Sequence, residues 1–321
     1  MQQRNLLSNI GSTPIVDVSF MENKGASIFG KAEFLNPGGS VKDRVAKFII
    51  EKAEKQGVLK KGMSIVEATS GNTGIAVAMV GAIKGYNVKI IMPENMSEER
   101  KKIIRALGAE LILTSAKRGI RGSIDKLDEM RMRDGNIFTL DQFRNPDNTM
   151  AHYMTTGPEI WEALEGHVDV FLAGVGSGGT LMGVGKYLKE RNPAVSIIAV
   201  EPHNASALLG HEPGLHKIEG IGDGIVPDIV EPDLIDEVVE VRDEDAICTA
   251  RRLAKEKGIF VGISSGANVW AATEIANHLE ANKVIVTVLP DRAERYFSTE
   301  LFMDRPLLKT QVFKKGRIYY E

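Results

Sequence analysis

One lysine in this sequence has a type and setting that could support covalent chemistry. Lys42 follows a glycine pair, Gly38 and Gly39, at the expected first turn of a helix. The positive end of a helix disfavours an ammonium group, and partial burial disfavours it further. A lysine held as the neutral amine can attack an aldehyde and form a Schiff base. Lys42 is therefore a candidate catalytic residue.

A glycine-rich turn in the second half of the chain could bind an anion. Gly174–Thr180 reads Gly-Val-Gly-Ser-Gly-Gly-Thr and stands between an expected buried strand and an expected helix. Glycines let the backbone approach a ligand closely, and the free N–H groups of a helix start attract anions, so we expect phosphate binding. The stretch also satisfies G-x-G-x-x-G, and Glu201 ends the following strand, so a nicotinamide dinucleotide is an alternative ligand.

Two further turns are rich in hydroxyl and amide groups. Thr69–Gly74 could bind a carboxylate, and Asn72 could donate to an oxygen, unless this turn only caps a helix. Gly262–Gly266 matches the G-x-S-x-G pattern of hydrolases. The only later histidine, His278, lies about four turns into the following helix, so a hydrolase triad is not supported. Ser264 is better suited to hydrogen-bond a ring nitrogen of a cofactor.

Short apolar strands alternate with helices around these turns, which is the pattern of a mostly parallel sheet covered on both faces. Strands are expected at 28–34, 64–68, 88–92, 110–114, 168–173, 195–200, 258–263 and 284–289. Helices are expected after Ser40, acting as an N-cap, and at 73–84, 98–107, 180–190, 243–255 and 267–279. Because both halves contain a strand, a turn, a helix and a strand that ends at proline, we predict two α/β units with a crevice between them.

Composition limits the classes of partner. The 321 residues predict about two compact units at ~150 residues each. The 40 basic and 43 acidic side chains leave a net charge of -3, which argues against a nucleic-acid groove or an anionic-membrane surface. The single cysteine excludes an internal disulfide and a multi-thiolate zinc site, and no histidine spacing indicates a metal. No apolar run approaches the ~20 residues that cross a bilayer, so we expect a soluble, cytoplasmic protein.

Three other side-chain groups have structural interpretations. Cys248 has apolar neighbours on an expected helix and is predicted to lie in the core. The basic run Arg100–Lys102 is predicted to form a solvated helix face. His152 is close in sequence to Gln142 but is predicted to be a packed histidine.

The four chemical features together match the needs of pyridoxal 5′-phosphate: a Schiff-base lysine, a phosphate turn, an amide for a phenolic oxygen and a hydroxyl for a ring nitrogen. The sequence resembles the fold-type II pyridoxal-phosphate enzymes of the cysteine synthase (O-acetylserine sulfhydrylase) and cystathionine β-synthase family, and it is closest to the cysteine synthase branch. The matching stretches are 36–44 (NPGGSVKDR), 69–74 (TSGNTG), 92–100 (MPENMSEER), 155–161 (TTGPEIW), 174–180 (GVGSGGT), 262–267 (GISSGA) and 289–299 (LPDRAERYFST).

The resemblance implies an α/β fold of the tryptophan synthase β-like type. Two subdomains, each a twisted mostly parallel sheet with helices on both faces, would enclose the active site in the crevice. Residues 43–150 would form a smaller mobile subdomain with the carboxylate loop, and residues 1–42 with 151–321 would form the larger subdomain that anchors the cofactor. A homodimer is also implied, acting on small amino-acid substrates.

The resemblance also implies a role for each site residue. Lys42 would carry the cofactor and shuttle the α-proton. The other cofactor-binding residues would be Asn72, Gly176, Ser177, Gly178, Gly179, Thr180 and Ser264. The substrate carboxylate would be bound by Thr69, Ser70, Gly71, Thr73 and Gln142.

The implied reaction is β-replacement on a β-substituted L-alanine through an aminoacrylate, with O-acetylserine or O-phosphoserine and sulfide giving L-cysteine. Asp223 departs from the family pattern, because cysteine synthases usually have a small apolar residue there, near the mouth of the site. A carboxylate at this place could act on water or on a second substrate, unless it is only a solvated turn residue. The alternative is therefore elimination or replacement on L-cysteine itself, releasing hydrogen sulfide, as in a cysteine lyase or a lanthionine or cystathionine synthase. Arg144 is also unusual in its motif and could recognise an extra carboxylate, unless it is only an exposed surface residue.

Overall fold

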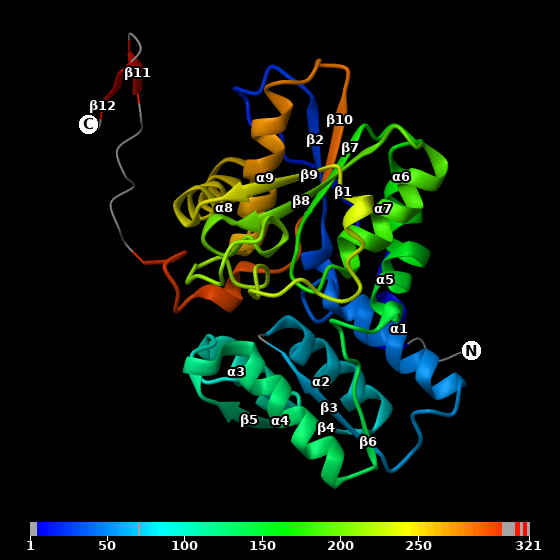
Figure 1. Cartoon of the computed structure of the whole chain (residues 1–321). Coiled ribbons are helices and arrows are strands. Elements are labelled where there is room, and N and C mark those ends of the chain that lie inside the picture. Colours follow the sequence, from blue (N-terminus) through cyan, green and yellow to red (C-terminus); the bar gives the residue numbers. More distant parts are fainter. Residues whose placement is uncertain (1–4, 70, 304–311, 315–316, 320–321) are drawn as a thin grey trace.

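The computed structural model describes residues 5–303 except residue 70, together with residues 312–314 and 317–319. Figure 1 shows two units, each built around its own sheet with helices on both faces. The larger sheet has the order β1(Ile15–Asp17), β2(Ser27–Lys31), β10(Val284–Val288), β7(Val170–Gly174), β8(Ser196–Pro202) and β9(Glu237–Val241). The smaller sheet has the order β5(Glu110–Thr114), β4(Asn87–Pro93), β3(Ser64–Ala68) and β6(Ile137–Phe138). A separate hairpin joins β11(Val312–Lys314) to β12(Arg317–Tyr319).

Both main sheets are parallel apart from one edge pair. All neighbours in the smaller sheet run parallel, and in the larger sheet only β1 and β2 run antiparallel. The α-helices are α1(Lys42–Lys55), α2(Asn72–Lys84), α3(Glu98–Ala106), α4(Gly119–Arg133), α5(Pro146–Ala151), α6(Gly157–Ala163), α7(Gly179–Arg191), α8(Asp243–Lys257) and α9(Ile263–Ala276). A π-helical turn, η4(His152–Thr156), joins α5 to α6. The 3₁₀ turns are η1(Leu6–Asn9), η2(Glu33–Leu35), η3(Ala116–Arg118), η5(His203–Ala205), η6(Ala207–Leu209), η7(Pro232–Leu234) and η8(Ala293–Tyr296).

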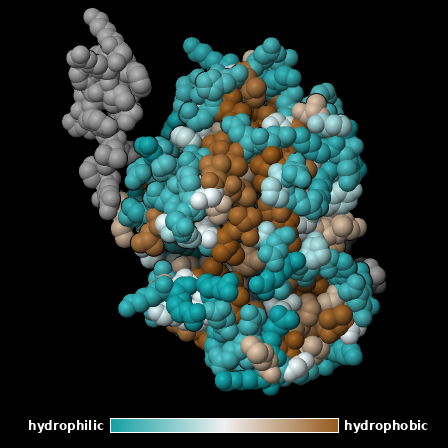
Figure 2. All heavy atoms as spheres, viewed as in Figure 1, coloured by the Kyte–Doolittle hydropathy of each residue, from teal (hydrophilic) through white to brown (hydrophobic). Residues whose placement is uncertain are grey.

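The core follows the two-residue period of the strands. In β7, Val170 and Leu172 pack into the cluster that contains α8 and α9, whereas Phe171 and Ala173 pack into the cluster that contains α7. Successive side chains of a strand point to opposite faces, so a strand covered on both sides is apolar throughout. Figure 2 shows hydrophobic residues in a band down the middle of the larger unit, between hydrophilic margins. The predicted α/β fold with two mostly parallel sheets is confirmed.

The smaller sheet is filled in the same way. Ile65 and Ile90 belong to the cluster that also contains residues of α1 and α2, and Val66 packs on the other face with Leu127 of α4. Helix α2 is buried from Thr73 to Gly81, as its almost uniformly apolar sequence predicts. The helix therefore forms part of the core directly behind the turn that precedes it.

Two predictions of secondary structure are wrong. Residues 258–263 form no strand, because Val261 makes only an isolated bridge to Arg292 and α9 begins at Ile263. Ser40 is not the N-cap of α1; Val41 occupies that position without a side-chain cap, and the backbone of Ser40 pairs with Asp291 in another bridge.

Cys248 is exposed and does not lie in the core. Ala246 and Ala250 of the same helix are buried. A residue two positions from each lies about 200° around the helix from them, and therefore faces away from the core.

Candidate functional site

Lys42 is the first residue of α1 and lies in the crevice between the two sheets. It lines two adjoining cavities, and Asn72 and Ser177 also line both of them. Burial lowers the pKa of Lys42, although the nearby carboxylates of Asp223 and Asp291 raise it in part. A lowered pKa increases the fraction of neutral amine, which is the nucleophilic form. The surroundings of Lys42 therefore favour the reactivity predicted for it.

The glycine turn before α7 forms a cradle without room for side chains. A Cβ at Gly176 would lie 2.4 Å from the carbonyl oxygen of Gly220, and a Cβ at Gly179 would lie 2.1 Å from Oδ1 of Asn148. Gly178 adopts a φ of +82°, a left-handed conformation that favours glycine. A turn of this kind leaves the N–H groups at the start of α7 free to bind an anion such as phosphate.

The donors around Lys42 fit a pyridoxal phosphate group. Gly176, Ser177, Gly178 and Thr180 line the same cavity as Lys42, and Ser264 lines it from the start of α9. The cavity thus combines an amine for the aldehyde, a glycine cradle for the phosphate and a hydroxyl for the ring nitrogen. The amide of Asn72 lines it as well and can donate to the ring oxygen.

The amide of Asn72 is held from both sides. Its Nδ2 donates to Oδ2 of Asp291 at 2.7 Å, and its Oδ1 accepts from Arg295 at 2.8 Å. Because the carboxylate can only accept and the guanidinium can only donate, the orientation of the amide is fixed and one N–H of Nδ2 stays free. Arg295 also donates to the carbonyl oxygen of Gly39 at 2.9 Å, in the loop that leads to Lys42.

Sequence reasoning missed Asp291 and Arg295 as site residues. Both stand in the LPDRAERYFST stretch and both are buried, Asp291 completely. The signal was a pair of opposite charges inside a motif that follows a buried strand. Nothing in the local pattern shows that they contact Asn72, which lies 219 and 223 positions away.

The turn before α2 brings together most of the predicted carboxylate-binding residues. Thr69, Gly71, Asn72, Thr73 and Gln142 line one cavity with Lys42. Oγ1 of Thr73 donates to Oε1 of Gln142 at 2.7 Å, which leaves the amide nitrogen of Gln142 available as a donor. Ser70 lies outside the described residues.

Glu67, at the end of β3, holds the loop that leads to Gln142. Its Oε2 accepts from the hydroxyl of Thr139 at 2.7 Å and from the N–H of Leu140 at 2.8 Å. Burial nevertheless raises the pKa of Glu67 to about 7, because desolvation outweighs these hydrogen bonds. The charge of a buried carboxyl next to the substrate loop therefore changes near neutral pH.

Asp223 lines the cavity that also contains Lys42, Thr69 and Gln142, which we call the catalytic pocket, and it is half-buried there. Burial raises the pKa of Asp223, and the charges of Lys42 and His216 lower it in part. Its neighbours Gly222 and Gly224 adopt φ values of +69° and +73°, so the loop turns tightly at this point. The side chain is not a fully solvated turn residue.

Arg100 is a second pocket residue that sequence reasoning placed wrongly. Only 1 % of it is exposed, and it lines the catalytic pocket. Its guanidinium pairs with Glu219, lies 3.9 Å from Oδ2 of Asp291 and stacks 4.7 Å from the ring centre of Tyr296. Lys101 is buried as well, so the predicted solvated face is wrong for Arg100 and Lys101, whereas Lys102 is exposed as predicted. Both side chains have buried or nearby partners. Arg100 contacts Glu219 and Tyr296, and Lys101 pairs with Glu98 and donates to the carbonyl oxygen of Glu94.

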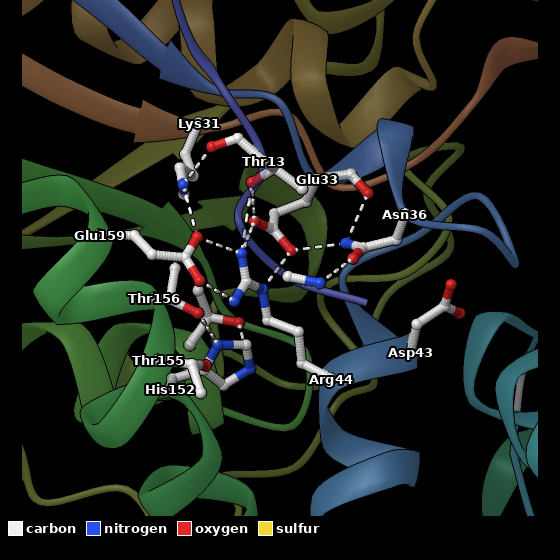
Figure 3. Close-up of polar contacts among 12 residues, drawn as sticks. Thr13, Lys31, Glu33, Asn36, Asp43, Arg44, His152, Thr155, Thr156 and Glu159 are labelled. Atoms are coloured by element: carbon white, nitrogen blue, oxygen red, sulfur yellow. Dashed lines mark hydrogen bonds and ion pairs between the residues drawn. The ribbon is translucent and has the colours of Figure 1, made fainter. Parts of the chain in front are cut away.

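A buried ionic network anchors α1 two residues after Lys42 (Figure 3). Arg44 lies between Glu33 and Glu159 and donates to both carboxylates at 2.6–2.8 Å. Lys31 pairs with Glu159 at 2.7 Å. Two cations and two anions balance here, which a buried network requires. The first turn of α1, and with it Lys42, is therefore fixed to β2 and α6.

His152 connects the π-helical turn η4 to the phosphate turn. Its Nδ1 lies 2.8 Å from Oγ1 of Thr156, and its Nε2 lies 3.3 Å from Oγ1 of Thr180. Burial holds the pKa of His152 well below its usual value, so the ring is neutral at neutral pH. The expectation of a packed histidine is confirmed, since 1 % of it is exposed.

Glu201 is bonded within the turn that follows β8 and is not among the residues that line the two cavities at Lys42. Its Oε2 accepts from the hydroxyl of Ser206 at 2.8 Å and from the N–H of Leu208 at 3.0 Å. Both are local contacts that stabilise the turn after β8. The carboxylate that would bind the ribose of a dinucleotide is thus already hydrogen-bonded to Ser206 and Leu208.

Comparisons with known proteins decide the family. The family model described as pyridoxal-phosphate dependent enzyme matches residues 6–291. The chain belongs to this family. The cysteine synthase of Staphylococcus aureus is 47% identical over 300 residues, which are 93% of this chain and 96% of that protein. The nicotinamide interpretation of Gly174–Thr180 is therefore wrong, and the cofactor is pyridoxal 5′-phosphate.

Solved structures agree with this assignment. A cysteine synthase from Entamoeba histolytica has a TM-score of 0.89 and 44% identity, with 95% of this chain and 94% of that chain covered. A hydrogen sulfide-producing enzyme from Fusobacterium nucleatum has a TM-score of 0.88 and 40% identity, with 91% and 99% covered. The predicted membership of the fold-type II, cysteine synthase-like group is confirmed. In the part of the chain that the structure describes, no helix is long and apolar enough to span a membrane.

Proposed function

We propose that this enzyme makes L-cysteine by β-replacement, with O-acetylserine or O-phosphoserine as first substrate and sulfide as the nucleophile. The similarity to cysteine synthases over more than nine-tenths of the chain supports this reaction. The observation that carries it is Lys42, whose pKa is lowered by burial, in one cavity with the glycine cradle.

Each site residue has a defined task in this proposal. Pyridoxal phosphate, when bound, supplies an electron sink that stabilises negative charge on the substrate α-carbon. Lys42 would hold the cofactor through its Nζ, and the same Nζ would take the α-proton of the substrate. The glycine cradle binds the phosphate, Asn72 donates to the ring oxygen, and Ser264 meets the ring nitrogen with a neutral hydroxyl. A neutral partner keeps the ring a moderate electron sink, which suits loss of a good leaving group.

The substrate carboxylate is assigned to the turn before α2. Thr69, Gly71 and Thr73 present hydroxyl and N–H donors, and Gln142 presents its amide. We divide the chain into a mobile subdomain, 43–150, and an anchoring subdomain, 1–42 with 151–321. Closure of the mobile subdomain on the carboxylate would exclude water from the reacting atoms.

The test is a substrate comparison with the holoenzyme. O-acetylserine, O-phosphoserine, serine and cysteine are mixed separately with it, and the release of each leaving group is followed with and without sulfide. We expect O-acetylserine or O-phosphoserine to react fastest and L-cysteine to form only when sulfide is present. Lys42→Ala should abolish turnover, and equal turnover by this variant would overturn the assignment.

A second candidate function rests on Asp223. Its carboxylate shares the catalytic pocket with Lys42, where it can take a proton from water or a thiol and repels the hydrosulfide anion. The similarity to a hydrogen sulfide-producing enzyme of Fusobacterium nucleatum also supports a reaction that releases sulfide. We propose as the alternative that the enzyme runs on L-cysteine and releases sulfide. Asp223→Asn should then lower sulfide release from cysteine strongly, whereas unchanged release would remove Asp223 from the mechanism.

We also propose that the enzyme is a homodimer located in the cytoplasm. A homodimer acting on small amino acids is what the family resemblance implies. A location in the cytoplasm and the lack of a nucleic-acid or membrane partner are expectations from the charge balance and the short apolar runs. Light scattering of the purified holoenzyme during gel filtration gives the mass directly, and a monomer mass would contradict the dimer.

A further inference from the structure

Arg100 places a positive charge at the boundary between the two proposed subdomains. It stands on α3, within the segment 43–150, and only 1% of it is exposed. In Figure 1, α3 lies on the side of the smaller unit that faces the larger unit, next to η8. Oε2 of Glu99, on the same helix, accepts from the hydroxyl of Ser298 at 2.7 Å. Because burial of a guanidinium costs free energy unless charged partners surround it, the position of Arg100 depends on its partners.

The charged and aromatic partners of Arg100 belong to the anchoring subdomain. Its guanidinium pairs with Glu219, lies 3.9 Å from Oδ2 of Asp291 and stacks on the ring of Tyr296. Glu219 begins the loop that carries Asp223. A movement of the smaller subdomain away from the larger one would therefore separate Arg100 from these partners.

The same side chain touches the turn that we assign to the substrate carboxylate. A Cβ at Gly71 would lie 2.6 Å from Nε of Arg100, so the guanidinium packs directly against the backbone of this turn. This Nε is buried and has no hydrogen-bond partner within the described residues. Inside the turn, the N–H of Gly71 donates to Oγ1 of Thr69 at 3.1 Å. Arg100 therefore limits the positions that the backbone of Gly71 can take.

The pair of Arg100 and Glu219 differs from the pair of Arg144 and Asp228, which also crosses the boundary. The side chains of the first pair are 2% and 26% exposed, and those of the second are 51% and 71% exposed. Water and salt weaken an exposed pair, whereas a buried charge that loses its partner stays unpaired in the interior. The buried pair is therefore the contact that can link the carboxylate turn to the loop of Asp223.

We propose that Arg100 is a positioning residue that links the carboxylate turn to the loop of Asp223. When the crevice closes on the first substrate, the pair with Glu219 holds this loop against the turn. The packing of Arg100 on Gly71 keeps the N–H groups of the turn directed at the carboxylate. This inference rests on the proposed function, which assigns the carboxylate to this turn, and it adds a residue that acts through its neighbours.

The test measures the binding of an amino acid that has an α-carboxylate but no leaving group. L-Alanine is titrated into the holoenzyme, and its Kd is measured from the absorption spectrum of the bound cofactor. Arg100→Gln should raise this Kd about tenfold and Glu219→Gln about threefold, because each weakens one charge-assisted contact. Arg105→Gln is the matched control, since Arg105 is exposed on the same helix and should leave the Kd unchanged.

The variant Glu219→Gln separates a link from simple electrostatics. It removes a negative charge near the carboxylate site, so an effect of charge alone would lower the Kd of L-alanine instead of raising it. Its side chain is 26% exposed and the amide keeps an acceptor, so this variant tests the link even where Arg100→Gln does not fold. A Kd that falls or stays unchanged in Glu219→Gln would overturn the proposal.

The double variant and the cofactor provide two further controls. Because both substitutions remove the same ion pair, the double variant should raise the Kd of L-alanine about tenfold, and a rise of about thirtyfold would mean that the residues act independently. The Kd of pyridoxal phosphate should change less than about threefold, since only the 3.9 Å contact to Asp291 leads toward Asn72. An equal loss of affinity for both ligands would indicate a structural effect and contradict the proposal.

A failure of the proposed function gives a different result. Acetate release from O-acetylserine by the unmodified holoenzyme is measured in parallel. Absence of that release would contradict the proposed β-replacement, whereas the binding of L-alanine needs no leaving group and still tests the link. The two failures can therefore be told apart.

Discussion

Two turns occupy the same place in the two halves of the molecule but present different groups to a ligand. Gly174–Thr180 leads from β7 into α7, and Thr69–Gly74 leads from β3 into α2. The first is made of backbone, and its glycines are packed so closely that no Cβ fits at Gly176 or Gly179. The second is made of side chains, and its Asn72 is bonded across the crevice to the segment that follows β10.

The difference indicates that the two turns bind different ligands. A backbone cradle is rigid and suits a phosphate that stays bound through every turnover. A turn that presents hydroxyl and amide side chains can respond to each incoming carboxylate, and its link across the crevice couples that response to the opposite wall. The glycine turn should therefore govern cofactor affinity. In the second turn the threonine side chains should govern substrate affinity, whereas Asn72 contributes to the cofactor.

The largest expected effect comes from filling the glycine cradle. In Gly179→Ala the new Cβ would meet Oδ1 of Asn148 at 2.1 Å, so the turn must move. We expect the apoenzyme to lose about 100-fold or more in affinity for pyridoxal phosphate, equivalent to ~3 kcal/mol. Gly135→Ala is the control, since no atom lies within 4 Å of a Cβ there. Equal cofactor affinity in both variants, measured by fluorescence titration, would show that the glycine turn does not determine cofactor binding.

A pH-dependent stability is expected from the carboxyl behind the second turn. Burial raises the pKa of Glu67 from 4.5 to about 7. A raised pKa means that the folded state holds the proton more tightly, so the stabilising contribution is complete below pH ~4.5 and is lost as the pH rises to about 7. At ~1.4 kcal/mol per pKa unit the loss reaches about 3 kcal/mol.

The variant Glu67→Gln tests this contribution because its amide oxygen can accept the same hydrogen bonds without a charge. The variant should gain stability relative to the unmodified protein between pH 5 and pH 8, measured by urea unfolding at each pH. Glu129→Gln on the surface should show no such trend. A stability difference that stays constant over this pH range would contradict the raised pKa.

Removing one hydroxyl from the second turn should change substrate affinity alone. Thr73 donates to Gln142 and lines the catalytic pocket. We expect Thr73→Val to raise KM for O-acetylserine about tenfold, the usual cost of one hydrogen bond to a charged group. Cofactor affinity should remain unchanged. A loss of cofactor affinity as large as in Gly179→Ala would show that the two turns do not divide the work.

The smallest effect is expected at the link between the turn and the opposite wall. Asp291→Asn keeps an acceptor for Asn72 but holds its amide less firmly on one side, since the replacement can also donate, while Arg295 still binds Oδ1 of Asn72. We expect a decrease of about threefold in cofactor affinity and a shifted absorption maximum of the bound cofactor, because Asn72 meets the ring oxygen. An unchanged spectrum would mean that Asp291 does not orient Asn72.

Much of the fold and of the candidate site could be predicted from the sequence because the signals are local. The glycine turn, Lys42 and the Thr/Asn turn each lie in a continuous stretch next to a strand or a helix. Helix α4 was not predicted, since two glycines interrupt its first turns. The wrong strand at 258–263 has an apolar pattern, but its residues lead into α9 without a partner strand.

The missing site residues are those whose partners are distant in the chain. Arg100 looked like part of a solvated basic run, and only the fold brings Glu219 and Tyr296 to it. Asp291 and Arg295 belong to a stretch used for the family resemblance, yet their contact with Asn72 depends on how the two sheets meet. Buried charges of this kind have no local signature.

The most direct test of the central claim locates the bond between enzyme and cofactor. The holoenzyme is reduced with borohydride, digested, and mapped by mass spectrometry for a pyridoxyl-labelled lysine. We predict a single labelled peptide with the modification on Lys42, whose surroundings lower its pKa. A label on any other lysine, or its persistence in Lys42→Ala, would contradict the account.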